Sequence, residues 1–225
     1  MIDIHAQTRL FLKELKDCFA DRIWFVGLQG SYGRGEATES SDMDMVVILD
    51  ELTPADVHRY HAMLDRLPHR DLMCGFLSGK KELLSWEPSD LFQLYFDTTP
   101  LVGSLDMLLP LLDGQAVYRV IKLGACNLYH GCVHNMLYGH KENALRHLYK
   151  SATFVVQAIC YQQTGHYYRH QKDLHEMVQP REREILDIAR ELKNGGSVRF
   201  AEMSENLMMW CQFWIQQEAP ERGSV

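Results

Sequence analysis

The sequence predicts an α+β protein, in which a small mixed-sheet domain precedes a helical bundle. Two observations support this fold class. Short apolar runs alternate with helical patterns as far as Pro100, and long patterns of 3.6-residue period dominate from about Leu105 onward. The change of period predicts two domains, residues 1–113 and 114–225.

The composition is that of a globular protein. The chain has 225 residues, 46% of them hydrophobic and 24% charged, which is enough to build a buried core. No apolar run approaches the roughly 18 residues of a membrane span. The first residues lack the basic and apolar pattern of a secretory signal. We therefore expect a cytoplasmic protein, and the sequence is compatible with a homodimer.

The charge and the cysteines narrow the function classes. A net charge of −7 opposes broad binding to nucleic acid, which requires a basic surface, so no nucleic-acid polymer is expected as a partner. The six cysteines include no CxxC pair, which indicates reduced thiols in a reducing compartment.

Four strands are predicted in the first domain. The run at 43–49 is apolar on both faces, which favours a covered, central strand. Thr53 and Pro54 are a typical N-cap and first residue of a helix that we expect to reach about Leu67. Further helices are expected near residues 10–19 and in "KKELLSW". The predicted strands are 22–29, 43–49, 71–77 and 91–98.

The second domain is predicted to be helical throughout. The triplet Asn194-Gly195-Gly196 marks a break before the last helix. The predicted helices are 105–112, 115–138, 142–164, 173–193 and 198–218.

Two aspartates stand together where the second strand begins. Side chains at i and i+2 of a strand point to the same face, so Asp42 and Asp44 project together, while Met43 and Met45 face the core. Two carboxylates at a strand end suit a hard divalent cation, Mg²⁺ above all. The alternative is that Asp42 is a turn residue and Asp44 a solvated charge.

A third carboxylate would complete such a metal site. Asp71, at the start of the third predicted strand, is the first candidate, and Asp97 is the second.

The glycine-rich turn "GSYGRG" directly follows the first predicted strand. Such turns expose backbone N–H groups that bind phosphate oxygens, and Ser31 and Arg34 add a hydroxyl and a guanidinium. Glu36 stands where a P-loop requires lysine, and the glycine spacing differs from the dinucleotide fingerprint GxGxxG. The alternative is a turn that needs glycine only for its backbone freedom.

The turn and the carboxylates together form a longer pattern. Gly30-Ser31, Arg34-Gly35 and Ser41-Asp42-Met43-Asp44 resemble the signature of the DNA polymerase β-type nucleotidyltransferase superfamily. The resemblance implies that Gly30, Ser31, Arg34 and Ser41 hold a nucleoside triphosphate. It also implies that Asp42, Asp44 and a third acid hold Mg²⁺, with Mn²⁺ as a substitute.

The second half resembles the aminoglycoside nucleotidyltransferases, the kanamycin nucleotidyltransferases in particular. The similar stretches are "LYKSATFVVQAICYQQTGHYYRHQKDL" and "SENLMMWCQFWIQQ". This resemblance implies transfer of a nucleoside monophosphate, AMP from ATP·Mg²⁺, to a hydroxyl of a small, aminoglycoside-like acceptor. Glu142 is the nearest counterpart of the general base, and Lys141 and Lys150 are candidates for contact with the triphosphate. Ordinary exposed helix charge is the alternative for all three.

One departure from the superfamily pattern concerns the third acid. Members often carry it in the middle of the third strand, where "LMCGF" has none. A catalytically degenerate nucleotide-binding regulatory module therefore stays open. The resemblance to the superfamily leaves a second alternative, a protein-modifying adenylyltransferase of toxin–antitoxin type.

Two further groups of residues lie in the second half. Cys126, His130 and His134 share a helix face with zinc-compatible spacing, and Cys132 is expected on another face of that helix. The histidines could instead contact substrate or act as a general base, and burial of the whole group in the bundle is the favoured interpretation. The segment "HYYRH" at 166–170 could contact a ligand or serve as a polar connection between helices.

Overall fold

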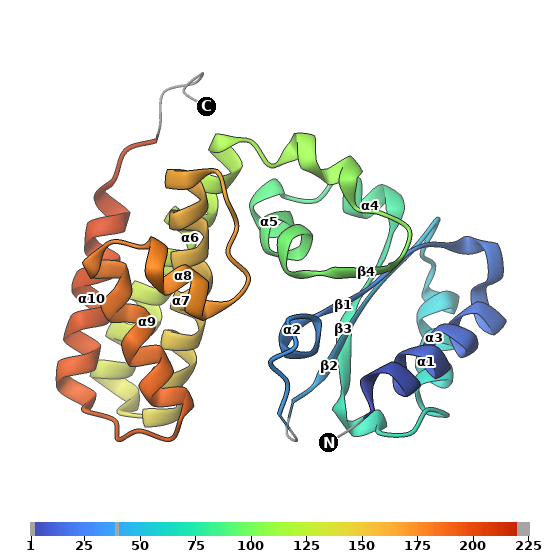
Figure 1. Cartoon of the computed structure of the whole chain (residues 1–225), viewed down its shortest axis with the longest axis horizontal. Coiled ribbons are helices and arrows are strands. Elements are labelled where there is room, and N and C mark those ends of the chain that lie inside the picture. Colours follow the sequence, from blue (N-terminus) through green and yellow to red (C-terminus); the bar gives the residue numbers. More distant parts are fainter. Residues whose placement is uncertain (1–2, 39–40, 220–225) are drawn as a thin grey trace. The chain divides into compact units, whose positions relative to one another are not determined.

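The computed structural model describes residues 3–38 and 41–219. By its internal contacts the chain divides into two compact units, Met1–Leu111 and Leu112–Val225 (Figure 1). Each unit is described separately below.

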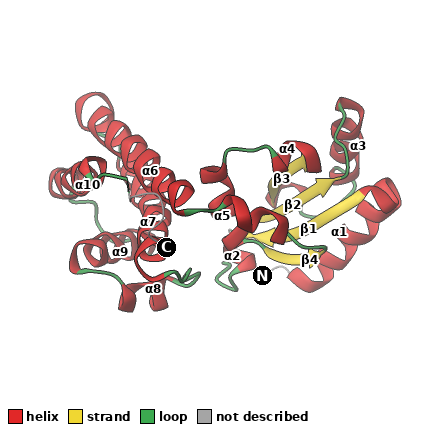
Figure 2. Cartoon of the chain, turned by 90° about the horizontal axis from the view of Figure 1, so that it is seen from above, coloured by secondary structure: helices red, strands yellow, loops and turns green. Residues whose placement is uncertain are grey.

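The N-terminal unit is a small sheet with helices packed on it. Figure 2 shows its strands flanked by the helices of the same unit. In chain order its elements are α1 (Ile4–Phe19), η1 (Ala20–Arg22), β1 (Ile23–Gln29), α2 (Gly30–Gly33), β2 (Met43–Leu49), α3 (Pro54–Leu64), η2 (Arg70–Leu72), β3 (Met73–Gly79), α4 (Lys80–Leu84), α5 (Pro88–Asp97), β4 (Thr99–Val102) and η3 (Asp106–Leu111).

The sheet is mixed, with the strand order β3-β2-β1-β4. β1 is antiparallel to both β2 and β4, whereas β2 and β3 are parallel. A parallel pair needs a crossover connection, and α3 lies in the segment that joins β2 to β3. The predicted α+β fold class is confirmed, as is the central position of β2.

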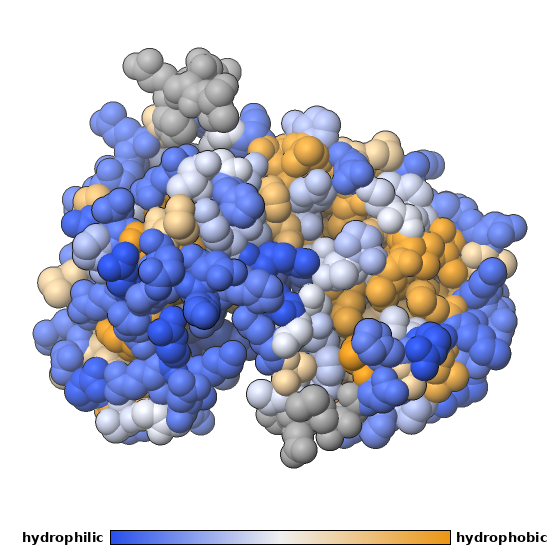
Figure 3. All heavy atoms as spheres, viewed as in Figure 1, coloured by the Kyte–Doolittle hydropathy of each residue, from blue (hydrophilic) through white to orange (hydrophobic). Residues whose placement is uncertain are grey.

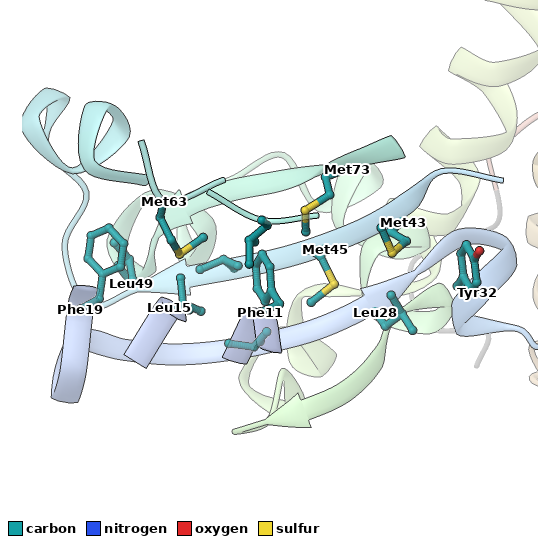
Figure 4. Packing of buried hydrophobic residues seen from close by; sticks show 13 residues of the cluster. Phe11, Leu15, Phe19, Leu28, Tyr32, Met43, Met45, Leu49, Met63 and Met73 are labelled. Carbon is teal, nitrogen blue, oxygen red and sulfur yellow. The ribbon is translucent and has the colours of Figure 1, made fainter. Parts of the chain in front are cut away.

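One face of the sheet packs against α1 and α3. Met43 and Met45 on β2 belong to a buried cluster with Phe11, Leu15 and Met63 from these helices (Figure 4). All five side chains are at most 2% exposed. Full burial of one such side chain contributes about 1.5–3 kcal/mol. The packing therefore fixes which face of β2 turns away from the core.

The predicted fourth strand is wrong, because residues 88–97 form the helix α5. Pro88 occupies the first turn, and the Glu87 side chain accepts a hydrogen bond from the Ser89 N–H, so the helix has a regular start. Its buried residues Leu91, Phe92 and Leu94 supplied the apolar, aromatic run that favoured a strand. The actual fourth strand is the short β4, directly after α5.

The other predicted elements of this unit occur with shifted ends. β3 begins at Met73, two residues after the predicted start. The N-cap of α3 is confirmed as a capping box: the Thr53 hydroxyl accepts from the Asp56 N–H, and the Asp56 carboxylate accepts from the Thr53 N–H. α3 ends at Leu64 instead of Leu67. The "GSYG" turn is a single helical turn, α2.

The C-terminal unit is a bundle of helices, in which α6 packs against both α7 and α10. The predicted helix 173–193 is two helices, because a new helix begins at Pro180, and residues 106–111 form a 3₁₀ segment rather than an α-helix. The elements are α6 (Gly114–His134), the π-helical turn η4 (Asn135–Gly139), α7 (Glu142–Thr164), α8 (Gln171–Met177), α9 (Pro180–Lys193) and α10 (Phe200–Gln216).

Buried polar groups tie the helices of this bundle together. The Tyr149 hydroxyl donates to the Met203 carbonyl at 2.8 Å, which joins α7 to α10. The buried Glu182 carboxylate of α9 accepts from the indole N–H groups of Trp210 and Trp214 at 3.4 and 3.0 Å. Both tryptophans therefore belong to the bundle core, where their N–H groups are satisfied.

The visible surfaces of the two units differ in character. Figure 3 shows a hydrophobic area over part of the N-terminal unit and mostly hydrophilic side chains over the C-terminal unit. Within residues 3–38 and 41–219, no helix has the length and apolar character needed to cross a membrane.

Candidate active site

Asp44 lies on the face of β2 that turns away from α1 and α3, and Asp42 directly precedes this strand. Met43 and Met45, which flank Asp44 in the sequence, point into the buried cluster (Figure 4), so Asp44 projects from the opposite face. Asp42 is exposed, and Asp44 is half-buried. The packing agrees with the predicted direction of Asp44, and the shared face of the pair stays a prediction.

Gly30 lies directly against the carboxylate of Asp44. Gln29 at the end of β1 pairs with Asp44 on β2, and the next residue, Gly30, has a φ of +67°. A Cβ atom at Gly30 would lie 2.1 Å from Asp44 Oδ2. Position 30 thus requires glycine for two reasons: its φ is positive, and the Asp44 carboxylate occupies the space of a Cβ atom. The glycine-serine turn and Asp44 therefore lie side by side.

The two serines of the motif have different surroundings. Ser31 is half-buried in α2, and its carbonyl accepts from the Glu36 N–H at 2.8 Å, which folds the turn back on itself. The Ser41 hydroxyl accepts from the Thr38 N–H at 2.8 Å, and the Ser41 N–H donates to the Thr38 carbonyl at 3.1 Å. Ser41 is therefore bonded to Thr38 just before the aspartates.

Arg34 forms a buried ion pair. Its Nη1 donates to Asp97 Oδ2 at 2.5 Å, and its Nε donates to Glu36 at 3.3 Å. The Arg34 and Asp97 side chains are only 17% and 2% exposed. This guanidinium ties the glycine-rich segment to the end of α5. A triphosphate bound by Arg34 would compete with two carboxylates, so the predicted phosphate contact stays a prediction.

The candidates for the third carboxylate occupy different places. Asp71 is exposed in η2, two residues before β3, at the end of the parallel β2–β3 pair where Asp42 also lies. Asp97, the second candidate, ends α5 and pairs with Arg34. Among residues 3–38 and 41–219, no three His, Cys, Asp or Glu side chains are grouped closely enough to hold a metal ion. The third ligand accordingly stays a prediction.

Cys74 holds the position on β3 that faces the aspartate pair. It is the register partner of Asp44 in the parallel β2–β3 pairing, and it is exposed. Paired residues of neighbouring strands project to the same face, so a thiol stands where a third acid on this strand would stand. Sequence reasoning missed this residue, because the sequence contains no signal for the register of a parallel pair.

The donor set fits a hard divalent cation in part. Two carboxylates on one face are oxygen ligands of the kind that Mg²⁺ and Mn²⁺ prefer. Such ions keep several water ligands, so two protein carboxylates with substrate phosphates can hold one.

The remaining predicted site residues belong to the C-terminal unit. Lys141 is the N-cap of α7, Glu142 is in its first turn, and Lys150 lies two turns further along the helix. All three side chains are exposed. The buried Asn135 side chain bonds both the N–H and the carbonyl of Lys141 at 3.0 Å, which fixes the start of α7. Their roles in nucleotide binding and as general base stay predictions.

The cysteine and histidine group on α6 holds no metal site in this structure. The rings of His130 and His134 lie 6.2 Å apart, and both residues are exposed, as is Cys126. Cys132 is buried, and its thiol donates to the Ser204 carbonyl at 3.3 Å. The favoured interpretation, burial in the bundle, is therefore correct for Cys132 and wrong for the other three.

Comparison with known proteins identifies the N-terminal segment. Residues 9–96 match the family model "Nucleotidyltransferase domain". The matched segment runs from α1 to α5 and includes the glycine-serine turn and both aspartates. No curated protein matches the chain.

Two solved structures are similar to the chain. The first is the spectinomycin adenyltransferase AAD(9) from Enterococcus faecialis with ATP and spectinomycin, at 15% identity and a TM-score of 0.57, covering 94% of this chain and 97% of that chain. This likeness shows that the fold extends over both units. The second is a toxin-antitoxin with AMP-PNP, at 19% identity and a TM-score of 0.35, covering 53% of this chain and 90% of that chain, and we draw nothing from it.

Proposed function

Residues 9–96 form a nucleotidyltransferase domain of the DNA polymerase β type, and on that premise we propose that the protein is a cytoplasmic adenylyltransferase. It transfers AMP from ATP·Mg²⁺ to a hydroxyl of a small acceptor of aminoglycoside type. The two compact units act as the two domains expected at 1–113 and 114–225, and no nucleic-acid polymer takes part.

One observation carries the proposal: Gly30 lies against the carboxylate of Asp44. An aspartate that is only a solvated charge at a strand end does not require glycine at the neighbouring position. A nucleotide site requires close approach of the turn and the carboxylate, because the phosphates and the metal ligands must meet at one place. The pairing of β1 with β2 and the positive φ of Gly30 bring the proposed phosphate-binding turn next to Asp44.

The residues of this chain divide the work as follows. Asp42 and Asp44 hold the cation, with Asp71 as the proposed third ligand. Gly30, Ser31 and Ser41 position the triphosphate, and Arg34 orders the segment that carries them. When bound, a divalent ion supplies charge neutralisation and lowers the pKa of the acceptor hydroxyl. The acceptor oxygen then bonds to the α-phosphorus, the bond to the leaving oxygen breaks, and pyrophosphate departs.

The C-terminal unit supplies the proposed general base and further cations. Glu142 accepts the proton of the acceptor hydroxyl, and Lys141 and Lys150 contact the triphosphate. The AAD(9) structure, which holds ATP and spectinomycin, supports an acceptor of this class because its fold spans the same two units.

Pyrophosphate release with a panel of acceptors tests the proposal. We expect release from ATP with Mg²⁺ or Mn²⁺ and at least one amino-sugar acceptor. Asp42→Asn with Asp44→Asn should abolish it, because an amide does not replace a carboxylate as a Mg²⁺ ligand. The matched control is Asp17→Asn, which removes an exposed carboxylate on α1. Failure of every nucleotide and acceptor to release pyrophosphate would contradict the proposal.

The panel must include proteins as well as antibiotics. A protein acceptor would gain the mass of one AMP, which mass spectrometry of the incubated mixture detects. That result would favour the protein-modifying alternative over the antibiotic-modifying one.

The position of Cys74 supports a second candidate, a nucleotide-binding regulatory module. A thiol opposite Asp44 leaves two carboxylates where a third would strengthen metal binding. Such a module would bind ATP without turnover. Cys74→Asp separates the two functions: appearance of pyrophosphate release only in this variant would favour the module, whereas release by the unaltered protein would exclude it.

A further inference from the structure

Arg169 has two buried guanidinium nitrogens that find no hydrogen-bond acceptor in the described part of the chain. It lies in the connection between α7 and α8, within the segment "HYYRH". Its Nε and Nη2 atoms are both inaccessible to solvent, and neither finds an acceptor within residues 3–38 and 41–219. The residue as a whole is half-buried.

This state is unfavourable for an arginine. A guanidinium remains charged at every physiological pH, so it cannot avoid burial by losing its proton. Buried charges are normally paired, and unsatisfied buried N–H groups carry the full penalty of lost hydration. The described chain therefore supplies no acceptor to the buried edge of Arg169.

Other arginines of the same unit show the usual arrangement. Arg146 donates to the carbonyls of Leu192 and Gly196 at 2.6 and 2.8 Å. Arg199 donates to both carboxylate oxygens of Glu191 at 2.7 and 3.2 Å. The bundle thus supplies acceptors to these two guanidinium groups, whereas two buried nitrogens of Arg169 have none in the described chain.

The two unsatisfied atoms define the shape of the missing acceptor. Nε–H and Nη2–H lie on one edge of the guanidinium and point in parallel. This edge fits two oxygens of one oxyanion, as in bidentate arginine–phosphate pairs.

The backbone that carries Arg169 is held in place from α7. The buried Gln157 side chain donates to the Tyr168 and Arg169 carbonyls at 2.9 and 3.5 Å. Gly165, with a φ of +71°, ends α7 and donates its N–H to the Tyr161 carbonyl at 2.8 Å. A fixed backbone presents the guanidinium with less ordering on binding.

We propose that Arg169 anchors an oxyanion site in the C-terminal unit, which binds a phosphate group through Nε and Nη2. The group belongs either to inorganic phosphate or pyrophosphate, or to a nucleoside triphosphate. The nucleotide form of the inference rests on the proposed function, whereas the oxyanion site does not.

Calorimetric titration of the full-length protein tests this site. Phosphate, pyrophosphate and ATP are titrated separately without divalent metal, at an ionic strength held constant with KCl. We expect at least one of them to bind, and Arg169→Met to weaken its binding by about 10-fold or more, since a charged bidentate pair is lost. Arg169→Lys should also weaken binding, because an ammonium ion lacks the fork. Arg190→Met, which removes a 46% exposed arginine of the same unit, should leave binding unchanged.

Folding of the variants is checked by thermal unfolding in KCl. Arg169→Met should unfold at a temperature no lower than the unaltered protein, because it leaves no carboxylate unpaired. Phosphate or pyrophosphate should then raise the unfolding temperature of the unaltered protein more than that of the variant. If Arg169→Met fails to fold, the decision rests on Arg169→Lys. Absence of binding to the unaltered protein, or equal binding to the Arg169 variants, would overturn the inference.

Repeating the titrations with Asp42→Asn and Asp44→Asn separates this inference from the proposed function. Binding of pyrophosphate that depends on Arg169 in this background establishes the oxyanion site even where no nucleotidyl transfer is found. Binding of ATP, but of neither phosphate nor pyrophosphate, identifies the nucleotide as the source of the phosphate group.

Discussion

Two loops of the molecule each carry a partly buried arginine, and they use it in opposite ways. Arg34, in the glycine-rich segment after β1, has its guanidinium occupied by Asp97 and Glu36. Arg169, in the connection between α7 and α8, has two buried nitrogens without an acceptor in the described chain. The arginine inside the recognisable phosphate motif is thus the one with its donors already in use.

This difference indicates that residue type and motif predict ligand binding less well than whether the N–H groups of an arginine already have acceptors. A guanidinium paired with buried carboxylates contributes to folding, because breaking the pair leaves a buried charge uncompensated. A guanidinium whose buried donors lack an acceptor carries an uncompensated loss of hydration, which a bound anion would offset. We therefore expect substitution of Arg34 to change the free energy of unfolding, and substitution of Arg169 to change the affinity for a ligand.

The largest expected effect comes from breaking the Arg34–Asp97 pair. Arg34→Met leaves a carboxylate that is 2% exposed without its cation, and we expect a loss of about 3–5 kcal/mol in the free energy of unfolding. Urea denaturation of the full-length protein measures it. Arg66→Met is the control, since Arg66 pairs with Glu14 at the surface and its removal should change stability by less than about 1 kcal/mol. Equal losses in the two variants would remove the distinction between buried and exposed pairs.

A smaller effect is expected at the glycine beneath Asp44. Gly30→Ala meets both a positive φ and the carboxylate oxygen, and we expect a loss of about 1–3 kcal/mol in the free energy of unfolding. Pyrophosphate release should fall as well, because Asp44 must move. Gly35→Ala is a matched control: its φ is +71°, but a Cβ there has nothing within 4 Å. Similar pyrophosphate release by the two variants would argue against a site built around the Gly30–Asp44 contact.

The third prediction concerns Arg22, a second arginine paired with a carboxylate, and the dependence of stability on pH. Arg22 donates to both oxygens of Asp56, at 2.8 and 3.0 Å, and this pairing, with the Thr53 hydrogen bonds, lowers the pKa of Asp56. A lowered pKa stabilises the fold above the ordinary aspartate pKa of 3.8, and this stability is lost as the pH falls below that value. Asp56→Asn should therefore reduce the dependence of stability on pH in this acid range.

Circular dichroism of urea unfolding at several pH values between neutrality and about 2 measures that dependence. Asp17→Asn is the control, because Asp17 is exposed and pairs with the exposed Lys13. If Asp56→Asn follows the pH dependence of the unaltered protein, the Arg22 pair makes no contribution through Asp56.

Much of the fold could be predicted from local signals. β1 and β2 follow from short apolar runs, and the start of α3 follows from Thr53, Pro54 and Asp56, which need only neighbouring residues to form a capping box. The errors also have local causes. The aromatic run of α5 favoured a strand, although Pro88 marked a helix start, and Pro180 marked the break between α8 and α9.

The site was predictable only where it is local in the sequence. Gly30 and Asp44 stand in one motif whose order and spacing indicate a nucleotide site. The partner of Arg34 lies 63 residues away, and the partner of Asp44 on β3 depends on a register that no sequence signal fixes. The unsatisfied state of Arg169 is a property of the packed bundle, so its residue type alone does not reveal it.

The closeness of Gly30 and Asp44 along the chain has a consequence for the order of folding. The two residues meet as soon as β1 and β2 pair, which closes only the short connection between these strands. The Arg34–Asp97 contact closes a far longer loop, at an entropic cost higher by about 1 kcal/mol. We therefore expect the geometry of the glycine-serine turn to appear early in folding, before the Arg34–Asp97 ion pair forms.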